Sequence, residues 1–426
     1  MPMTISAYDA VLKEVLLPYV RDNYPKQSVL LDNFKRNAGV QSMNNEFIAP
    51  IRTSRHGGIA NLASDSATIP TASGVTYSRG TVSVKTPVAT FDITRLAIDA
   101  SRSSNLAVTP ALENQAKTLA DDYGRFLNRQ LYWDGVGVVA QLRQTGGSVS
   151  GTEAAIEAVG NGTGPDDGRV QDWYGTINSD GQAASLRADK YLAVGNRVGI
   201  GTAAAVVGTV SALTGSSIQF TGTLSLAASD SVYIVSDPST TGAGTHEFTG
   251  LKAALSSSTG TSTYAGLPRT VQGWTPAFGS ASEALTLNSM QTTYLRAFEF
   301  AQSSDKYVIL VNQTLYNKYA NILSAMRRTV NETALLGGFT GLEFAAGGKV
   351  VGVFIDYDVP DGEVVIINLD TWTICQVSDM TWDDEPGMST MLRLQNTLSY
   401  QAVMHWFANV LCLAPGANGH LTRKTA

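Results

Sequence analysis

Hydrophobic positions change their spacing several times along the chain, and each spacing predicts a different kind of element. Residues 5–45 carry helical spacing that is interrupted at Pro18 and Pro25, which predicts an arm of short helices with little core of its own. Residues 46–98 alternate instead as two long strands around a polar tip at residues 63–74. Because an isolated two-stranded hairpin is marginal in water, we expect this hairpin to dock onto another surface.

A long amphipathic helix is predicted directly after the hairpin. Thr109 and Pro110 give an N-cap and first-turn signal, and apolar residues then recur every three or four positions as far as Leu131. The predicted helix has about 22 residues and a length of roughly 33 Å at 1.5 Å per residue. Gly135 and Gly137 are expected to end it.

The middle of the chain predicts a small barrel. Residues 145–186 are rich in Gly, Asn and Asp, and they are expected to form a connection with little regular structure. Short strands separated by turn residues follow, which indicates a small antiparallel β-barrel inserted into the main domain. The expected strands are residues 191–194, 197–200, 206–213, 218–221 and 231–235.

The C-terminal part mixes helix and strand patterns. These patterns do not alternate as they do in a doubly wound parallel sheet, so the predicted fold class is α+β. The expected helices are residues 287–298 and 315–323, and the expected strands are residues 307–311, 350–353, 364–369 and one long final run, 399–413.

Composition adds an argument about the surface. The chain has 426 residues, of which 43% are hydrophobic and only 15% charged, against roughly 25% charged in a typical globular protein. This length exceeds the usual limit of one hydrophobic core, so two or three compact units are expected. The net charge of -6 and the pI near 5.3 argue against a dedicated nucleic-acid binder. A surface with so little charge is expected to be covered by other molecules.

The N-terminal residues bear on location. Asp9, Lys13 and Glu14 interrupt the apolar residues there, which is typical of neither a signal peptide nor a membrane span. The protein is therefore expected to stay in the cytoplasm unless it leaves inside an assembly.

Motifs for catalysis or metal binding are missing from the sequence. The histidines are scattered, and no HExxH, Walker A or GxSxG sequence occurs. His405 lies in an apolar run, where a core residue with satisfied hydrogen bonds is expected. Cys375 and Cys412 are too few for a disulfide framework and are expected to be buried thiols. We therefore predict no enzymatic activity and no cofactor.

Two acidic segments lie at expected turns. Residues 356–362 superficially resemble a calcium loop, but Ile367 stands where the bidentate Glu is needed, so a Pro-Asp-Gly turn is the preferred interpretation. Asp383, Asp384 and Glu385 form the second segment. It is interpreted first as a solvated loop, with a cation site or a contact to a basic patch on a neighbour as alternatives.

The order of these elements resembles the coat-protein fold of tailed bacteriophages, the Hong Kong 97-type fold, which herpesviruses and encapsulin compartments also use. Residues 91–98 (FDITRLAI), which lead into the long helix, are similar to the junction of extended loop and spine helix in that family. Residues 337–344 (GGFTGLEF), followed by VVGV at 350–353 and PDG at 360–362, are similar to the Gly-Gly turn and the returning strand. The resemblance covers nearly the whole chain except residues 145–245.

The resemblance implies a major capsid protein that self-assembles into the icosahedral head of a virion, in the host cytoplasm, and encloses double-stranded DNA. The implied partners are further copies in hexamers and pentamers, a portal protein, a decoration protein and, because the arm starts almost at Met1, a separate scaffolding protein. The implied units are an N-terminal arm (1–45), an extended loop (46–100), the spine helix with the start of the peripheral domain (101–145), an insertion with the barrel (146–245), an axial domain (246–350) and the return strands of the peripheral domain (351–426).

The resemblance also suggests where subunits meet. Positive side chains along the hairpin are expected to contact acidic residues of a neighbouring subunit, although the sequence does not pair them individually. The hairpin tip has no Lys, so the covalent Lys–Asn cross-link of some family members is not expected. The candidate contact residues are Arg52, Arg55, Arg79, Lys85, Asp383, Asp384 and Glu385. Alternative functions are an encapsulin-like compartment shell, a β-rich tail or adhesin component, and a hydrolase of unknown type.

Overall fold

The computed structural model describes most of the chain from Val29 to Thr425. The described residues are 29–37, 41–43, 45–65, 68–71, 73–103, 111–135, 137–143, 149–156, 192–200, 206–214, 217–226, 231–234, 246–256, 262–281, 283–302, 306–328, 342–356, 358–359, 362–383 and 391–425.

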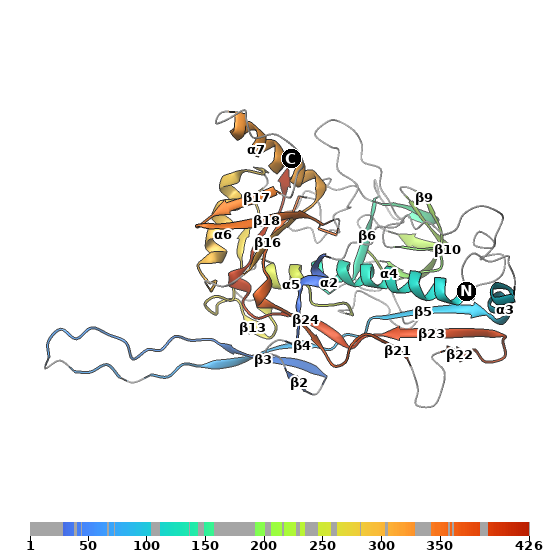
Figure 1. Ribbon diagram of the computed structural model, residues 1–426, viewed down its shortest axis with the longest axis horizontal. Coiled ribbons are helices and arrows are strands. Elements are labelled where there is room, and N and C mark those ends of the chain that lie inside the picture. The colour runs from blue at the N-terminus through green and yellow to red at the C-terminus, as the bar shows by residue number, and fades with distance from the viewer. Residues whose placement is uncertain are drawn as a thin grey trace.

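Helix α4 (Ala111–Tyr132) has 22 residues, as its hydrophobic spacing predicts, and packs against an antiparallel sheet (Figure 1). Strand β5 (Val88–Thr94) pairs along its whole length with β23 (Ser399–His405) in this sheet. The Tyr123 hydroxyl donates to the carbonyl of Pro87 at 2.8 Å and ties the helix to the sheet. The other members of this unit are β21 (Thr381–Trp382), β22 (Met391–Arg393) and helix α3 (Arg95–Ser103), which follows β5.

The predicted hairpin is present but shorter than expected. Strands β3 (Glu46–Arg52) and β4 (Tyr77–Ser83) are antiparallel, and β2 (Gln41–Met43) adds a third strand beside β3. Residues 84–98 were expected to belong to the hairpin, yet they leave it, because β5 finds its hydrogen-bond partners in β23. Beyond Arg52 and Tyr77, the described residues continue away from the body without strand pairing (Figure 1).

The root of the arm joins the main hydrophobic core. Helix α2 (Val29–Asn33) buries Leu30, and the ring of Phe34 stacks on Trp372 with centroids 5.4 Å apart. This agrees with the expectation that the arm finds its burial against other segments. The same core contains the three-stranded sheet of β1 (Lys35–Arg36), β20 (Trp372–Gln376) and β24 (Ala408–Cys412), helix α5 (Leu251–Leu255), and the hairpin of β12 (Thr263–Tyr264) and β13 (Leu267–Pro268).

The final run at residues 399–413 was predicted as one strand, and this prediction was wrong. The run is divided at Trp406 and Phe407 into β23 and β24, which belong to different sheets. The Trp406 amide donates to the carbonyl of Pro87 at 3.2 Å at this break. The two halves pair with different strands. Because the run is apolar throughout, its pattern does not indicate where the first strand ends.

A six-stranded mixed sheet separates two hydrophobic cores. Its central strand β19 (Val364–Asn368) is buried on both faces: Val364 and Ile366 contact the second core, whereas Val365 and Ile367 contact the main core. Helices α6 (Leu287–Phe298) and α7 (Gln313–Arg328) cover the second core. The strand order is β14 (Ala277–Gly279), β25 (Gly419–Leu421), β19, β16 (Tyr307–Val311), β18 (Lys349–Ile355) and β17 (Leu342–Ala346).

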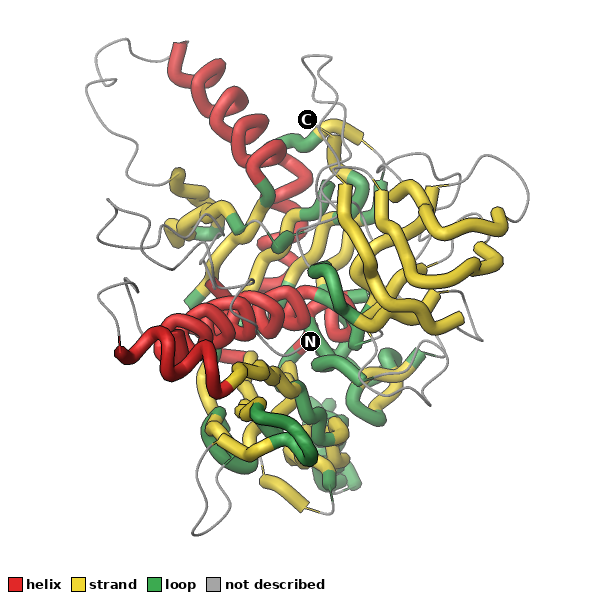
Figure 2. The backbone as a smooth tube through the Cα atoms, turned by 90° about the vertical axis from the view of Figure 1, so that its right-hand side faces the viewer, coloured by secondary structure: helices red, strands yellow, loops and turns green. Residues whose placement is uncertain are grey.

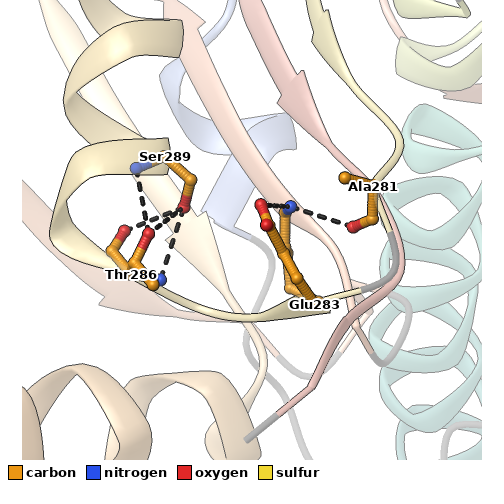
Figure 3. A network of polar contacts seen from close by, with 5 residues as sticks. Ala281, Glu283, Thr286 and Ser289 are labelled. Atoms are coloured by element: carbon orange, nitrogen blue, oxygen red, sulfur yellow. Dashed lines mark hydrogen bonds and ion pairs between the residues drawn. The ribbon is translucent and has the colours of Figure 1, made fainter.

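The C-terminal residues complete this sheet. Strand β25 lies between β14 and β19, and β26 (Lys424–Thr425) pairs with β15 (Glu283–Ala284). The buried ammonium of Lys424 donates to the carbonyl of Ala281 at 3.0 Å and to Glu283 at 2.7 Å (Figure 3). Next to it, Thr286 and Ser289 form a capping box that begins α6. Short 3-10 turns, Leu369–Thr371 and Pro415–Ala417, connect the neighbouring strands.

A closed six-stranded barrel lies on the side of α4 opposite to β5 and β23 (Figure 1), and Figure 2 shows strands on both sides of the helix. Residues 192–194 do not form the strand predicted there; they lead into a turn at Gly195, whose φ of +93° favours glycine. Two further strands complete the barrel, and one of them, at residues 149–156, comes from the region 145–186 that was expected to have little regular structure. Around the barrel, the order is β10 (Ser217–Leu226), β7 (Val149–Ile156), β6 (Val138–Arg143), β11 (Ser231–Ile234), β8 (Arg197–Ile200) and β9 (Val206–Thr214).

Two of the expected unit boundaries fall inside these sheets. The boundary at 145/146 separates β6 from the rest of the barrel, and the boundary at 350/351 cuts through β18. Such boundaries depend on which distant segments pair as strands, and the local spacing of hydrophobic residues contains no information about this pairing.

Candidate inter-subunit surface

All three predicted contact arginines lie in the hairpin and are exposed. Arg52 and Arg79 are at the outer end of the paired strands, and Arg55 is on the unpaired continuation. The Nε of Arg52 donates to the carbonyl of Ser54 at 2.9 Å. The three guanidinium groups therefore give positive charge to a projection that stands away from the body.

Apolar side chains accompany these arginines. Ile59 is 82% exposed and Ile69 is 77% exposed, and Leu62 and Tyr77 are exposed as well. Exposed apolar residues are normal when they are scattered singly, but several on one narrow projection indicate an interaction site. The hairpin thus has the composition of a surface that another molecule covers.

Lys85 lies apart from the arginines. Strand β4 ends at Ser83, and the backbone of Lys85 bridges to Ala408 at the root of the hairpin. The side chain is half-buried there, and this burial lowers the pKa of Lys85. Lys85 therefore lies apart from the three exposed arginines with which the sequence analysis grouped it.

The acidic candidates lie in a region described only in part. Asp383 is exposed, and its amide donates to the carbonyl of Val403 at 2.7 Å; Asp384 and Glu385 are outside the described residues. Further exposed residues, acidic and apolar, occur at residues 377–380 and at Phe407, whose carbonyl accepts from the Val377 amide, and Asp379 forms an ion pair with the exposed Arg36 at 3.3 Å. We define the acidic patch as Val377, Asp379, Met380, Asp383 and Phe407.

The last two turns of α4 carry buried polar residues that sequence reasoning missed. Asn128, Arg129 and Gln130 are fully or almost fully buried; Asn128 bonds the arm and Asp358, and the other two bond residues 247–248. The side-chain oxygen of Asn128 accepts from the amides of Leu30 and Leu31 at 3.2 and 3.4 Å. This part of α4 therefore joins the arm to the rest of the core.

Arg129 forms an ion pair with Glu247 in the same interior region, and Gln130 accepts from the amide of Phe248 at 3.3 Å. Burial raises the pKa of Glu247, and Arg129 opposes that shift. Gly137, with a φ of +85°, lies against Glu247, where a Cβ would come within 3.3 Å of the Glu247 side chain. The glycines follow the end of the helix, as predicted. In addition, the missing side chain of Gly137 leaves space for Glu247 in this ion pair.

Asp356 and Asp358 lie in the connection between β18 and β19, where a turn between two strands was predicted, and their burial is a feature that the turn pattern did not indicate. Both are buried beside α4, while residues 357, 360 and 361 lie outside the described residues. The Tyr132 hydroxyl donates to Asp356 at 2.7 Å, and the Asn128 amide donates to Asp358 at 2.7 Å. Burial, with a smaller contribution from Asp358, raises the pKa of Asp356 to about 6. The connection between β18 and β19 is therefore part of the buried hydrogen-bond network at the end of α4.

The remaining candidates for chemistry are structural. Cys375 and Cys412 are buried as expected, and desolvation raises the pKa of each thiol to about 12, so both are protonated at neutral pH. His405 is half-buried beside Phe407, and the buried histidine is His420, which lies 2.9 Å from Glu363. In the part of the chain that the structure describes, no group of His, Cys, Asp and Glu has an arrangement for a metal ion.

The helices give no candidate for membrane insertion. None of those described combines the length and the apolar character that a bilayer-spanning segment requires.

Comparison with known proteins finds similarity only at the level of structure. No family model and no curated protein matches the sequence. A chain of the cyanophage A-1(L) capsid superposes with a TM-score of 0.55 over 100% of both chains, at 13% identity. The capsid of a native GTA particle (TM-score 0.48, 10% identity, 99% and 98% covered) and an encapsulin from Synechococcus elongatus (0.43, 9%, 100% and 96%) are more distant.

The similarity to the cyanophage capsid chain defines the fold class. The chain has the α+β fold of a phage capsid subunit, so the predicted coat-protein fold is confirmed at this level. A shared fold at this identity does not carry function with it, and function has to be argued from the surface of the molecule.

Proposed function

We propose that the chain is the major capsid protein of a tailed phage, a structural subunit that self-assembles into the icosahedral virion shell around double-stranded DNA. The observation that carries this proposal is the hairpin, which projects from a capsid-type fold with Ile59 and Ile69 in solvent. A projection with no core of its own is marginal by itself, and contact with a second copy would bury it. A structural role of this kind needs no catalytic site.

Within this function, the elements have definite roles. We assign α4 as the spine helix and residues 46–83 as the extended loop, which is shorter than residues 46–100 because β5 belongs to the peripheral sheet. The six-stranded sheet is the core of the axial domain, and the barrel of residues 138–234 is an insertion. Hexamers and pentamers follow from heterologous contacts that close into rings.

The hairpin and the acidic patch are complementary in chemistry. The hairpin combines Arg52, Arg55 and Arg79 with apolar side chains. The acidic patch combines Asp383, and Asp379 in its ion pair with Arg36, with apolar side chains. Opposite charges across an interface guide association and fix its register. We therefore infer that the hairpin of one subunit lies over the acidic patch of its neighbour. The contact roles of Asp384 and Glu385 stay predictions from the sequence.

Electron microscopy of the purified full-length protein tests the function. Closed icosahedral shells are expected, and a stable soluble monomer at high concentration contradicts the proposal. DNA inside shells produced during infection distinguishes a phage head from an encapsulin-like compartment, which would hold protein cargo. Scaffolding, portal and decoration proteins stay predictions, and mass spectrometry of assembling particles would reveal them.

Deletion of residues 63–73 tests the role of the hairpin. The shortened protein is expected to keep the circular dichroism spectrum and melting temperature of the full-length protein, because the described residues of this segment, 63–65, 68–71 and 73, belong to neither hydrophobic core. Its yield of closed shells should drop strongly. Normal shells from this variant would refute the assignment of the loop, although not the capsid fold.

A further inference from the structure

The side chain of Asn418 joins several segments at the end of strand β19. It is fully buried, and its oxygen accepts from the amide of Asn368 at 2.8 Å and from the indole nitrogen of Trp372 at 2.9 Å. Its nitrogen donates to the carbonyl of Ala414 at 2.9 Å and to the hydroxyl of Thr371 at 3.0 Å. The site therefore fits a carboxamide, which accepts at one atom and donates at the other.

The residue after Asn418 is packed just as closely. Gly419 begins β25, where it pairs with Ala277 of β14 and with Ile366 of β19. A Cβ at Gly419 would lie 2.9 Å from Cγ2 of Thr293 in α6. Any larger residue would have to displace this helix, so the packing favours glycine directly after Asn418.

An Asn that is followed by Gly can react with its own backbone. In an open chain, the Gly419 nitrogen attacks the side-chain carbonyl carbon of Asn418, and the new C–N bond closes a five-membered succinimide ring. The side-chain nitrogen leaves as ammonia and carries away the proton of the Gly419 amide. Water then opens the ring to Asp or to isoaspartate, so the reaction needs no further reactant. Glycine favours ring closure because its backbone is flexible and it has no side chain in the way.

The folded structure opposes this reaction. The backbone of Asn418 is extended, with a φ of −125° and a ψ of 157°, which keeps the Gly419 nitrogen away from the side-chain carbon. Strand β25 is held between β14 and β19, and the hydrogen bonds of Asn418 fix its amide group. Ring closure therefore requires β25 to leave the six-stranded sheet, through local or global unfolding.

We propose that Asn418 is a deamidation site that the folded protein protects, and that its reaction makes the opening of the six-stranded sheet irreversible. A carboxylate at residue 418 places an oxygen against the carbonyl of Ala414, where a donor is needed, and two buried acceptors facing each other are destabilising. Isoaspartate adds an atom to the backbone where β25 begins. Chemical modification of the open state thus competes with refolding. The site requires only the described fold and does not rest on the proposed function.

Incubation of the full-length protein in urea tests the site. The Asn161→Gln variant is used, because Asn161 and Gly162 form the other Asn-Gly sequence of the chain. At mildly alkaline pH, the yield of refolded protein is expected to fall with time, in parallel with conversion at residue 418 measured by mass spectrometry of peptides. At mildly acidic pH, where the Gly419 nitrogen loses its proton less readily, both changes should be several-fold slower.

The same incubation without urea should leave residue 418 unmodified. Equal rates of conversion with and without urea would overturn the proposed protection. Full refolding of chains that carry the modification at residue 418 would overturn the proposed irreversibility.

The Asn418→Asp variant introduces one product of the reaction directly. Asn396→Asp is the matched control, because Asn396 is exposed in a turn with a φ of +60°, which Asp also tolerates. Asn418→Asp is expected to lower the melting temperature strongly or to yield insoluble protein, whereas Asn396→Asp should keep the melting temperature of the unaltered protein. A soluble Asn418→Asp variant with an unchanged melting temperature would contradict the proposal.

Discussion

The hairpin and the last two turns of α4 are both rich in charged and polar residues, but they use these residues differently. Arg52, Arg55 and Arg79 are exposed on the outer part of the hairpin, whereas Phe47, Ala49 and Val82 at its inner end belong to the main core. Arg129 is fully buried and paired with Glu247. The comparison shows that a charge inside the subunit already has its partner, whereas a charge on the hairpin is available to a second molecule.

The two regions should therefore respond to mutation in opposite ways. Changes near the end of α4 are expected to alter the free energy of unfolding of the subunit. Changes at exposed residues in the outer part of the hairpin are expected to leave that free energy nearly constant and to alter assembly. Four predictions test this separation.

Arg129→Met should cause the largest loss of stability. The substitution leaves Glu247 buried without its cation, and breaking a buried ion pair in this way typically costs about 3–5 kcal/mol. Denaturant unfolding of the subunit measures the loss. Arg79→Met is the matched control in the hairpin and should change stability by less than about 0.5 kcal/mol. Similar losses in both variants would contradict the comparison.

Phe34→Ala should reduce stability by about 3 kcal/mol, because it removes a buried ring that stacks on Trp372. Thermal unfolding measures the effect. Ile59→Ala removes a large apolar side chain in the exposed hairpin and should leave the melting temperature unchanged. A comparable decrease for Ile59→Ala would mean that the hairpin packs against its own subunit.

The pH dependence of stability should reveal Asp356. Its pKa is raised from 3.8 to about 6 in the folded protein. The stabilisation from its bound proton is therefore complete below pH 3.8 and is lost as the pH rises through 6. Between pH 5 and 8, the free energy of unfolding should fall by about 1 kcal/mol from this group. Chemical unfolding at several pH values measures this slope, which Asp356→Asn should flatten and Asp65→Asn should leave intact.

Arg79→Glu should have the smallest effect on stability and a clear effect on assembly. An exposed substitution changes the free energy of unfolding by less than about 0.5 kcal/mol. The yield of shells, counted by electron microscopy, should fall several-fold because the new carboxylate faces the acidic patch. Adding Asp383→Arg should restore part of the yield. Failure of this second change would argue against pairing of these two regions.

Strong local patterns in the sequence predicted the regular elements well. The spacing of apolar residues predicts α4, α6 and α7, and the exposed hairpin follows from alternation on both sides of a polar tip. Weak patterns failed, as for β7, whose sequence VSGTEAAI has small and polar residues in place of alternation. The break in residues 399–413 was also missed, because both halves of the run are equally apolar.

The candidate contact residues stay a prediction. Arg52, Arg55 and Arg79 are exposed, whereas Lys85 lies at the hairpin root. The interior network at Asn128 and Asp356 was not foreseen. Polar residues in an amphipathic helix normally indicate its solvent face, and a Pro-Asp-Gly sequence normally indicates an exposed turn.

The sequence by itself determined the α+β class, the long helix, the projecting hairpin and the weakly charged surface, because these features depend on local periodicity and composition. The tertiary structure alone decided which strands share a sheet and which polar residues are buried. The C-terminal strand β25 lies between β14 and β19, and Asp356 accepts a hydrogen bond from Tyr132. Both arrangements join segments that are distant in the sequence. Such long-range pairing follows from the packing of whole layers, which no local pattern contains.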